Sequence, residues 1–190
     1  MSRFARFIPF VLLATAGTAA AQSTQSAAQS PPAANPAPPP PSCTSAEHRQ
    51  FDFWVGRWDV YRTGTDQLVA HSLIENVYNG CTIRENWMPL RGGGGGSLNS
   101  WLPGERMWRQ TWTDSNNSYA VFEGRYENGA MVLTGIWAGA AGPGSRPLIR
   151  TRWTREQGGA VRQFGEASTD NGQTWTVSFD LTYRPAAAAN

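Results

Sequence analysis

Ten short strand-like segments follow one another between residues 57 and 184, each separated from the next by turn residues. The separators are rich in Gly, Asn and Asp, as in Asn79-Gly80 and Asn128-Gly129, which tight hairpin turns favour. Connections this short join antiparallel neighbours, because a parallel crossover needs about a dozen residues or more. The expected strands cover residues 57–63, 67–78, 81–88, 97–102, 106–113, 118–126, 130–138, 147–155, 160–168 and 173–184.

The last of these segments has the clearest alternation of apolar and polar residues. Since successive side chains of a strand point to opposite faces, this pattern predicts one face in the core and one in water. The side chains expected to face the core are Trp175, Val177, Phe179, Leu181 and Tyr183.

This succession predicts an all-β fold, an up-and-down antiparallel β-barrel of about ten strands. Consecutive short hairpins without a Greek-key crossover favour a barrel over a sandwich, and closure removes the sheet edges. A ten-stranded barrel is wider than the eight-stranded size that side chains alone can fill, so we expect an internal cavity. Thr44 and Glu47 have the spacing of a capping box and predict a short helical turn before the first strand.

The chain before the barrel has the composition of an export signal and a linker. Residues 1–21 combine Arg3 and Arg6 with a short apolar run and a small-residue end, which predicts a secretory signal peptide. The apolar run is shorter than a membrane span of about 20 residues, so the mature chain should have no transmembrane segment. Residues 22–42, rich in Pro and Ala, predict a disordered linker. The barrel should then occupy residues 43–185, with 186–190 as a disordered tail and the periplasm or the exterior as the location.

The cysteines and the charges restrict the chemistry. Cys43 and Cys81 are the two cysteines of an exported chain, which favours a disulfide; the alternative is one buried and one exposed thiol. All 16 basic residues are Arg, so lysine-dependent chemistry is excluded. Removing the signal leaves 14 Arg against 14 acidic residues, and this balance gives no support to nucleic-acid binding. The sequence predicts no oligomeric state.

A resemblance to a known family begins at Gly56-Arg57-Trp58, which looks like the G-x-W signature of lipocalin-type (calycin) barrels. In those barrels the Trp packs across the closed end, often against an Arg of the last strand. Arg184 has that position here, although strand alternation would place it outward. Wider phrases, including residues 97–100, 108–114 and 168–175, resemble an uncharacterised lipocalin-like family of exported bacterial proteins. The resemblance covers most of residues 47–184 and implies a calycin-like barrel, but no catalytic residues.

Two motifs that suggest chemistry have structural interpretations. Residues 168–175 match the Asp-box of sialidase propellers, where the Asp accepts turn N–H bonds and the Trp packs beneath. One box in a chain of this length does not make a propeller, so we expect a hairpin brace rather than a glycosidase. The five glycines of residues 92–96 lack the GK[ST] sequence of a phosphate loop. They predict a mobile loop at one barrel rim, either slack chain or a ligand gate.

Metal and haem sites find little support. His48 and His71 are the only histidines, and their spacing does not fit structural zinc. Similar ten-stranded barrels include haem-binding nitrobindin-like proteins, whose iron is held by a single His. Haem bound through His71 therefore remains an alternative. Otherwise we expect no cofactor.

Polar residues share strand faces with large aromatics in the middle of the chain. Ile83, Glu85 and Trp87 share one face, and the alternate residues from Arg106 to Trp112 share another. Apolar walls with a few polar groups are typical of a small-molecule pocket. The predicted ligand-binding residues are Trp58, Glu85, Trp87, Asn99, Trp101, Trp108, Gln110 and Trp112.

The sequence therefore favours an exported barrel that binds a small apolar or amphipathic molecule. Three alternatives stay open. The polar groups can form a structural network with one another, tryptophans can fill the interior of a structural or interaction module, or Glu85 can serve an enzyme of unknown reaction as acid or base.

Overall fold

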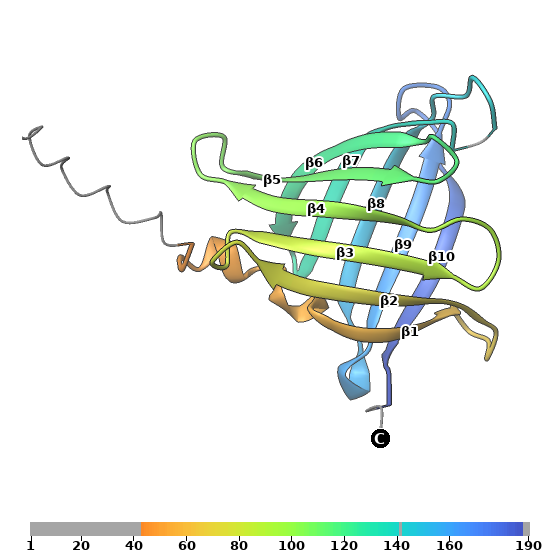
Figure 1. Cartoon of the computed structure of the whole chain (residues 1–190). Helices are drawn as coiled ribbons and strands as arrows, with labels where there is room; N and C mark the ends of the chain where they lie inside the picture. The colour runs from red at the N-terminus through yellow and green to blue at the C-terminus, as the bar shows by residue number, and fades with distance from the viewer. Residues whose placement is uncertain (1–42, 141, 188–190) are drawn as a thin grey trace, which may run out of the picture. The chain divides into compact units, whose positions relative to one another are not determined.

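The computed structural model describes residues 43–140 and 142–187, which form a closed barrel of ten antiparallel strands (Figure 1). Each strand pairs with the next one in sequence, and β10 pairs with β1 to close the barrel. The predicted up-and-down barrel is thereby confirmed. The strands are β1 (Gly56–Arg62), β2 (Leu68–Val77), β3 (Thr82–Pro89), β4 (Gly95–Leu102), β5 (Met107–Asp114), β6 (Tyr119–Glu127), β7 (Ala130–Ala138), β8 (Leu148–Arg155), β9 (Val161–Ser168) and β10 (Thr176–Pro185).

The observed strand ends differ from the predicted ones by at most three residues, and the turns explain why. Asn79, Asn128 and Asn171 adopt positive φ at the tips of their hairpins, as Asn tolerates in tight turns. Arg106 also has positive φ, at 53°, and belongs to the turn before β5. Its predicted place within that strand, on the face shared by Trp108, Gln110 and Trp112, is therefore wrong.

Two short 3-10 helices precede the barrel strands, η1 (Glu47–Arg49) and η2 (Asp52–Trp54), and a third, η3 (Gln157–Gly159), joins β8 to β9. The predicted helical turn is confirmed, but the predicted capping box is wrong. The residue at the N-cap of η1 is Ala46, with no side-chain cap. Ser45, not Thr44, donates its hydroxyl to Glu47 Oε2 at 2.7 Å.

The face assignment of the last strand is correct only beyond a β-bulge. Val177 pairs with Glu166 and Phe179 pairs with Gly165, so Ser178 is an extra residue between them. The bulge reverses the alternation, and Val177 is 64% exposed on the outer face. Trp175 lies beneath the guanidinium of Arg150, 4.2 Å from ring to Cζ. The inward prediction is therefore wrong for Trp175 and Val177, whereas Phe179, like Leu181 and Tyr183, lines the interior.

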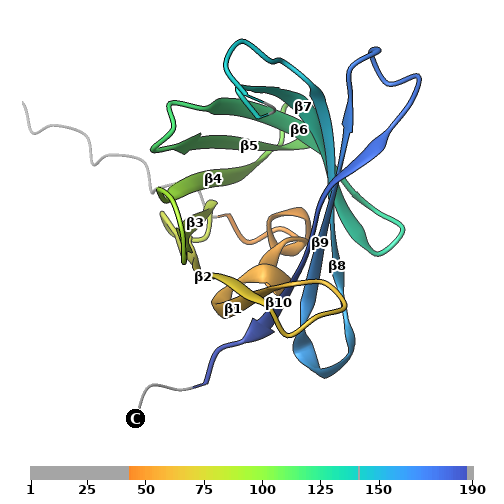
Figure 2. The same ribbon diagram turned by 90° about the vertical axis from the view of Figure 1, so that its right-hand side faces the viewer.

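Aromatic side chains fill one end of the barrel. Segment 47–54 lies within the ring of strands (Figure 2). Phe51 stacks on Trp54 at 4.9 Å and meets Trp153 edge-on at 5.3 Å. Burying rings of this size supplies much of the hydrophobic stabilisation of a small core. We call the buried rings at this end the aromatic plug; they are Phe51, Trp54, Trp58, Trp108 and Trp153.

The expected closed-end position of Trp58 agrees with the structure. Its Nε1 donates to the carbonyl oxygen of Trp54 at 2.9 Å, and its ring meets Tyr183 edge-on at 6.2 Å. Arg184 does not pack against it. As alternation predicts, the Arg184 side chain points outward, over the ring of Tyr61 at 4.2 Å.

A disulfide joins Cys43 to Cys81, as predicted, and fastens the start of the domain to the turn between β2 and β3. Arg49 supports the same connection, because its guanidinium donates to the carbonyl oxygens of Cys43 and Gly80. At the other end of the chain, Ala186 N donates to Arg57 O at 2.9 Å, so barrel hydrogen bonding extends one residue past the predicted boundary.

The predicted signal peptide and linker, residues 1–42, lie outside the described residues, as do residues 188–190 of the predicted tail. Within the described part, no helix is long and apolar enough to cross a membrane.

The outer surface of the barrel is held by pairs of Arg and acidic side chains on neighbouring strands. Arg84 donates to Glu75 at 2.6 Å, and Arg162 donates to Asp180 at the same distance. Exposed pairs of this kind contribute about 0–1 kcal/mol each. Further pairs on the outer face are Arg109 with Glu105 and Glu123, and Arg150 with Glu166.

Candidate ligand cavity in the barrel interior

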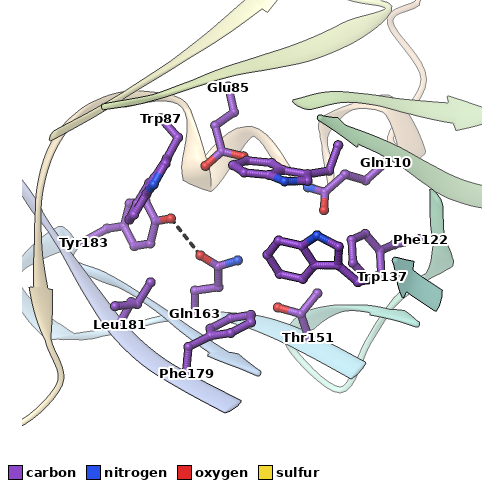
Figure 3. A pocket seen from close by; sticks show the side chains of 11 residues that line it. Glu85, Trp87, Gln110, Phe122, Trp137, Thr151, Gln163, Phe179, Leu181 and Tyr183 are labelled. Carbon is purple, nitrogen blue, oxygen red and sulfur yellow. Dashed lines mark hydrogen bonds between the residues drawn. The ribbon is translucent and has the colours of Figure 1, made fainter. Parts of the chain in front are cut away.

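The barrel interior contains a cavity of about 220 Å³ between the aromatic plug and the opposite end. Its wall comes from seven strands, β3, β5, β6, β7, β8, β9 and β10, each of which contributes alternate, inward-facing residues. The lining residues are Glu85, Trp87, Gln110, Trp112, Phe122, Trp137, Thr151, Gln163, Phe179, Leu181 and Tyr183 (Figure 3).

One side of the wall carries a buried hydrogen-bonded network. Ser97, opposite Glu85 in the β3–β4 pairing, donates its hydroxyl to Glu85 Oε2 at 2.8 Å. Asn99 Nδ2 donates to Ser97 Oγ at 3.0 Å and to Ile83 O at 3.0 Å. Gln110 Nε2 then donates to Asn99 Oδ1 at 2.7 Å. This chain of bonds satisfies side chains that would otherwise be costly to bury, and it fixes Glu85 and Gln110 in position.

Of the described residues that line the cavity, Glu85 is the only acidic one. Burial raises the pKa of its carboxyl group to about 7, against the opposing effect of the hydrogen bond from Ser97. The group therefore exchanges a proton near neutral pH. Its flanking residue on β3, Arg84, points outward to Glu75 and does not neutralise it.

The opposite side of the cavity is also polar but uncharged. Tyr183 donates its hydroxyl to Gln163 Oε1 at 2.7 Å, and burial, together with the charge of Glu85, holds the pKa of Tyr183 well above its usual value. Figure 3 shows this pair facing the Glu85 carboxyl group. Thr151 Oγ1 is buried and has no hydrogen-bond partner in the described structure. Unpaired buried polar atoms are uncommon, and one in a cavity wall is available to a bound molecule or water.

Aromatic rings line the end of the cavity away from the plug. Trp112 and Trp137 meet edge-on at 5.9 Å, and Trp137 meets Phe122 edge-on at 6.1 Å. Trp137 Nε1 donates to Ser118 Oγ at 2.8 Å, and Ser118 donates to Asp114 Oδ2 at 2.6 Å. These bonds tie the indole to the β5–β6 turn, so the cavity has a preformed ring surface.

Four of the eight predicted ligand-binding residues lie in the cavity wall, namely Glu85, Trp87, Gln110 and Trp112. Asn99 is fully buried in the network behind Gln110. Trp58 belongs to the aromatic plug. Glu85, Asn99 and Gln110 therefore belong to one hydrogen-bonded network, as the structural alternative predicts, and two of the three, Glu85 and Gln110, also line the cavity.

The remaining two predicted residues lie toward the closed end. Trp108 is part of the plug, and its Nε1 donates to Gln50 Oε1 at 3.1 Å. Trp101 packs against Trp108 at 6.5 Å and borders a separate outer hollow together with Arg106 and Tyr126. Neither lines the internal cavity.

Seven lining residues were not among the predicted ligand-binding residues, for different reasons. Trp137 follows Met131 and Leu133 at even spacing, so alternation within β7 was a usable signal for it. Gln163 gave no such signal, because in β9 the polar Gln163 faces inward while the apolar Phe164 lies beneath Arg162 on the outer face. Phe122 and Thr151 were not predicted either, whereas Phe179, Leu181 and Tyr183 were correctly predicted to face inward but not to bind a ligand.

The glycine run 92–96 lies at the rim, where β3 connects to β4, as predicted. Its second half is packed rather than slack. A Cβ atom at Gly94 would stand 2.8 Å from the carbonyl oxygen of Trp87, and one at Gly96 would stand 2.6 Å from that of Glu85. These glycines allow the start of β4 to approach β3 closely beside two cavity residues.

Residues 168–175 form the predicted hairpin brace. Asp170 accepts the backbone N–H of Thr174 at 2.8 Å and its hydroxyl at 2.6 Å, and Ser168 donates to it at 2.7 Å. Trp175 Nε1 donates to Gly172 O at 3.1 Å and packs against this glycine. The motif holds a turn at the rim and contributes nothing to the cavity wall.

His71 cannot serve the cavity as an axial ligand. Its side chain is 51% exposed on the outer face of β2, where Nδ1 contacts Asp59 Oδ1 at 2.8 Å. His48 contacts Ser45 through Nδ1 at 2.9 Å, at the closed end. Among the described residues, no cluster of three or more His, Cys, Asp or Glu side chains has the arrangement of a metal site. The haem alternative through His71 therefore does not fit this fold.

Comparisons with known proteins place no function on the cavity. No family model matches the chain, and no curated protein is significantly similar to it in sequence.

Proposed function

We propose that this protein is an exported barrel that binds a small, partly apolar molecule in its interior. The observation that carries the proposal is the cavity of about 220 Å³, which has aromatic walls and a few fixed polar groups. Such a composition is typical of small-molecule sites, where apolar surface provides affinity and polar groups provide orientation.

The size of the cavity limits the ligand. Pockets for drug-sized molecules measure about 300–1,000 Å³, whereas an apolar cavity of about 150 Å³ accommodates benzene. The cavity here, at about 220 Å³, therefore suits a molecule with one or two rings or an equivalent short chain.

The competing hypothesis of a structural module predicts an interior filled by tryptophans. Only the closed end of the barrel agrees with this prediction. Trp108 is packed into the plug, while Trp87 and Trp112 border empty space. The unpartnered Thr151 hydroxyl in the wall further favours a site over a packed core.

Export is the second part of the proposal, and it is supported by the sequence of residues 1–21. The disulfide between Cys43 and Cys81 is in keeping with an oxidising compartment.

Native mass spectrometry of the protein purified from the exported fraction of its own host tests the proposal. We expect an added mass of a small organic molecule at a stoichiometry of one per chain. The variant Thr151→Phe fills the cavity and should lose this mass, whereas Thr154→Phe, on the outer face of the same strand, should keep it. Equal occupancy of the two variants, or an empty native protein that binds no small aromatic probe, would contradict the proposal.

A further inference from the structure

We infer that the cavity selects a small organic cation, an amine or a quaternary ammonium attached to an apolar body, with Glu85 as its counter-ion. This inference deepens the proposed function and rests on it.

The charged and titratable side chains of the cavity wall do not suit a bound anion. Among residues 43–140 and 142–187, no Arg or His side chain lines the cavity, and the chain contains no Lys. The wall has two titratable groups, Glu85 and Tyr183, and Tyr183 stays neutral because burial raises its pKa. A bound anion would have no positive partner here and would face a carboxyl group, which is unfavourable in a low-dielectric interior.

Glu85 differs from the carboxylates on the outer face of the barrel. Glu75, Glu166 and Asp180 each accept a hydrogen bond from an Arg on a neighbouring strand. Glu85 receives one hydroxyl hydrogen bond, from Ser97 to Oε2, and no Arg in the described part of the chain reaches it. Buried charges are normally paired, so the ionised form of Glu85 lacks a partner that a ligand cation would supply.

The rings around Glu85 suit the same ligand. Trp87, Trp112 and Trp137 line the cavity together with Phe179. Indole faces attract cations more strongly than other side-chain rings, and the attraction is larger when the pair is removed from water. Glu85 and Trp87 are alternate residues on the inward face of β3 and both line the cavity (Figure 3), so one ammonium group can meet a carboxylate and a ring together.

The arrangement also predicts a pH dependence. Because the pKa of Glu85 is about 7 in the empty cavity, the carboxyl group is partly protonated at neutral pH. A cation favours the ionised form, so its binding near pH 7 releases a proton from Glu85 to the solvent. Tyr183 is the other titratable group that interacts with Glu85, and it remains neutral throughout this range.

Three probes with the same ring separate the charge preference from the cavity itself: 2-phenylethylamine, 2-phenylethanol and phenylacetate. Titration calorimetry near pH 8 should show the amine binding about ten- to a hundredfold more tightly than the alcohol, the range expected for a hydrogen bond to a charged group. Phenylacetate should bind least. In buffers of different ionisation enthalpy, binding of the amine near pH 7 should release a proton.

The variant Glu85→Gln should remove the preference for the amine while keeping the affinity for the alcohol. Glu75→Gln, on the outer face of β2, is the matched control and should leave the preference unchanged. The wild-type pH profile gives a second test that needs no variant. The amine stays protonated between pH 5 and 8, as lysine does, so loss of Glu85 ionisation alone should weaken it about tenfold or more toward pH 5.

The outcomes distinguish this inference from the proposed function. Equal affinities for amine and alcohol, or the tightest binding for phenylacetate, would overturn the cation preference and leave a binding barrel. A preference for the amine that persists at pH 5 would overturn the role of Glu85. Failure of all three probes to bind would count against the proposed function itself.

Discussion

The phenyl ring of Phe179 lies over Gly165, its partner in the β9–β10 pairing, and occupies the space where a Cβ atom of residue 165 would lie. The β-bulge at Ser178 turns this ring into the barrel, where it becomes part of the cavity wall. A glycine and a bulge on adjacent strands thus determine the shape of one side of the site.

Gly165→Ala should displace the Phe179 ring and lower the free energy of unfolding by about 1–3 kcal/mol, the usual cost of overpacking. Urea denaturation measures this change. In the double variant with Phe179→Ala the added methyl group finds space, so the two substitutions should couple in a double-mutant cycle. Additive effects would show that the close approach of ring and glycine has no energetic consequence.

The fold was predictable because its signals are local. Turn residues such as Asn79-Gly80 and Asn128-Gly129 fix hairpins between strands that are consecutive in the sequence. Once all ten strands are joined in this way, the pairing of β10 with β1 is the only one between strands distant in the sequence. The bulge at Ser178 was not predictable, since nothing in the alternating sequence of residues 173–184 marks an extra residue. It reversed the predicted face of Val177.

Only half of the predicted site residues line the cavity, because the sequence pattern does not show how far along the barrel axis each side chain lies. Alternation tells whether a side chain faces inward, but not whether it meets the aromatic plug or the open cavity. Trp108 and Trp112 lie on the same face of β5, yet the first contacts segment 47–54 and the second lines the cavity. That difference depends on where η1 and η2 enter the barrel, which the strand pattern does not specify.

Removing the disulfide should destabilise the domain without changing the cavity. Cys43 and Cys81 are 38 residues apart, and closing such a loop lowers the entropy of the unfolded chain by an amount worth on the order of 4 kcal/mol. Thermal unfolding of the double variant Cys43→Ala/Cys81→Ala, with reduced wild type for comparison, measures the loss. Affinity for a small aromatic probe should stay within a factor of two to three, because the cross-link lies at the closed end. A larger drop would mean that segment 43–54 shapes the cavity.

Asp170→Ala should open the hairpin at residues 168–175. Hydrogen bonds from the Thr174 hydroxyl and backbone N–H, and from Ser168, lower the pKa of Asp170 to about 2. A depressed folded-state pKa means that this stabilisation is present above the ordinary carboxyl pKa of about 4 and is lost as the pH falls toward 2. The melting temperature of the variant should therefore be several degrees below wild type at pH 7, and the two should converge near pH 2. Asp66→Ala, in an exposed turn at the same end, should have a smaller effect.

Glu85→Gln should stabilise the ligand-free protein at alkaline pH, although replacing a hydrogen-bonded carboxylate usually destabilises a protein. The folded-state pKa of Glu85, about 7, lies above the unfolded value of 4.5, so between these values the folded protein holds the proton more tightly. Stability contributed by the protonated form is complete below about pH 4.5 and is lost as the pH rises through 7. The variant and wild type should be equally stable near pH 4, and the variant should be more stable by on the order of 3 kcal/mol near pH 8. Chemical denaturation at these two pH values measures the difference. If the difference in unfolding free energy were the same at both pH values, the buried carboxyl group would not titrate as its surroundings require. A saturating organic cation should abolish the advantage of the variant at pH 8, because it stabilises the ionised wild type.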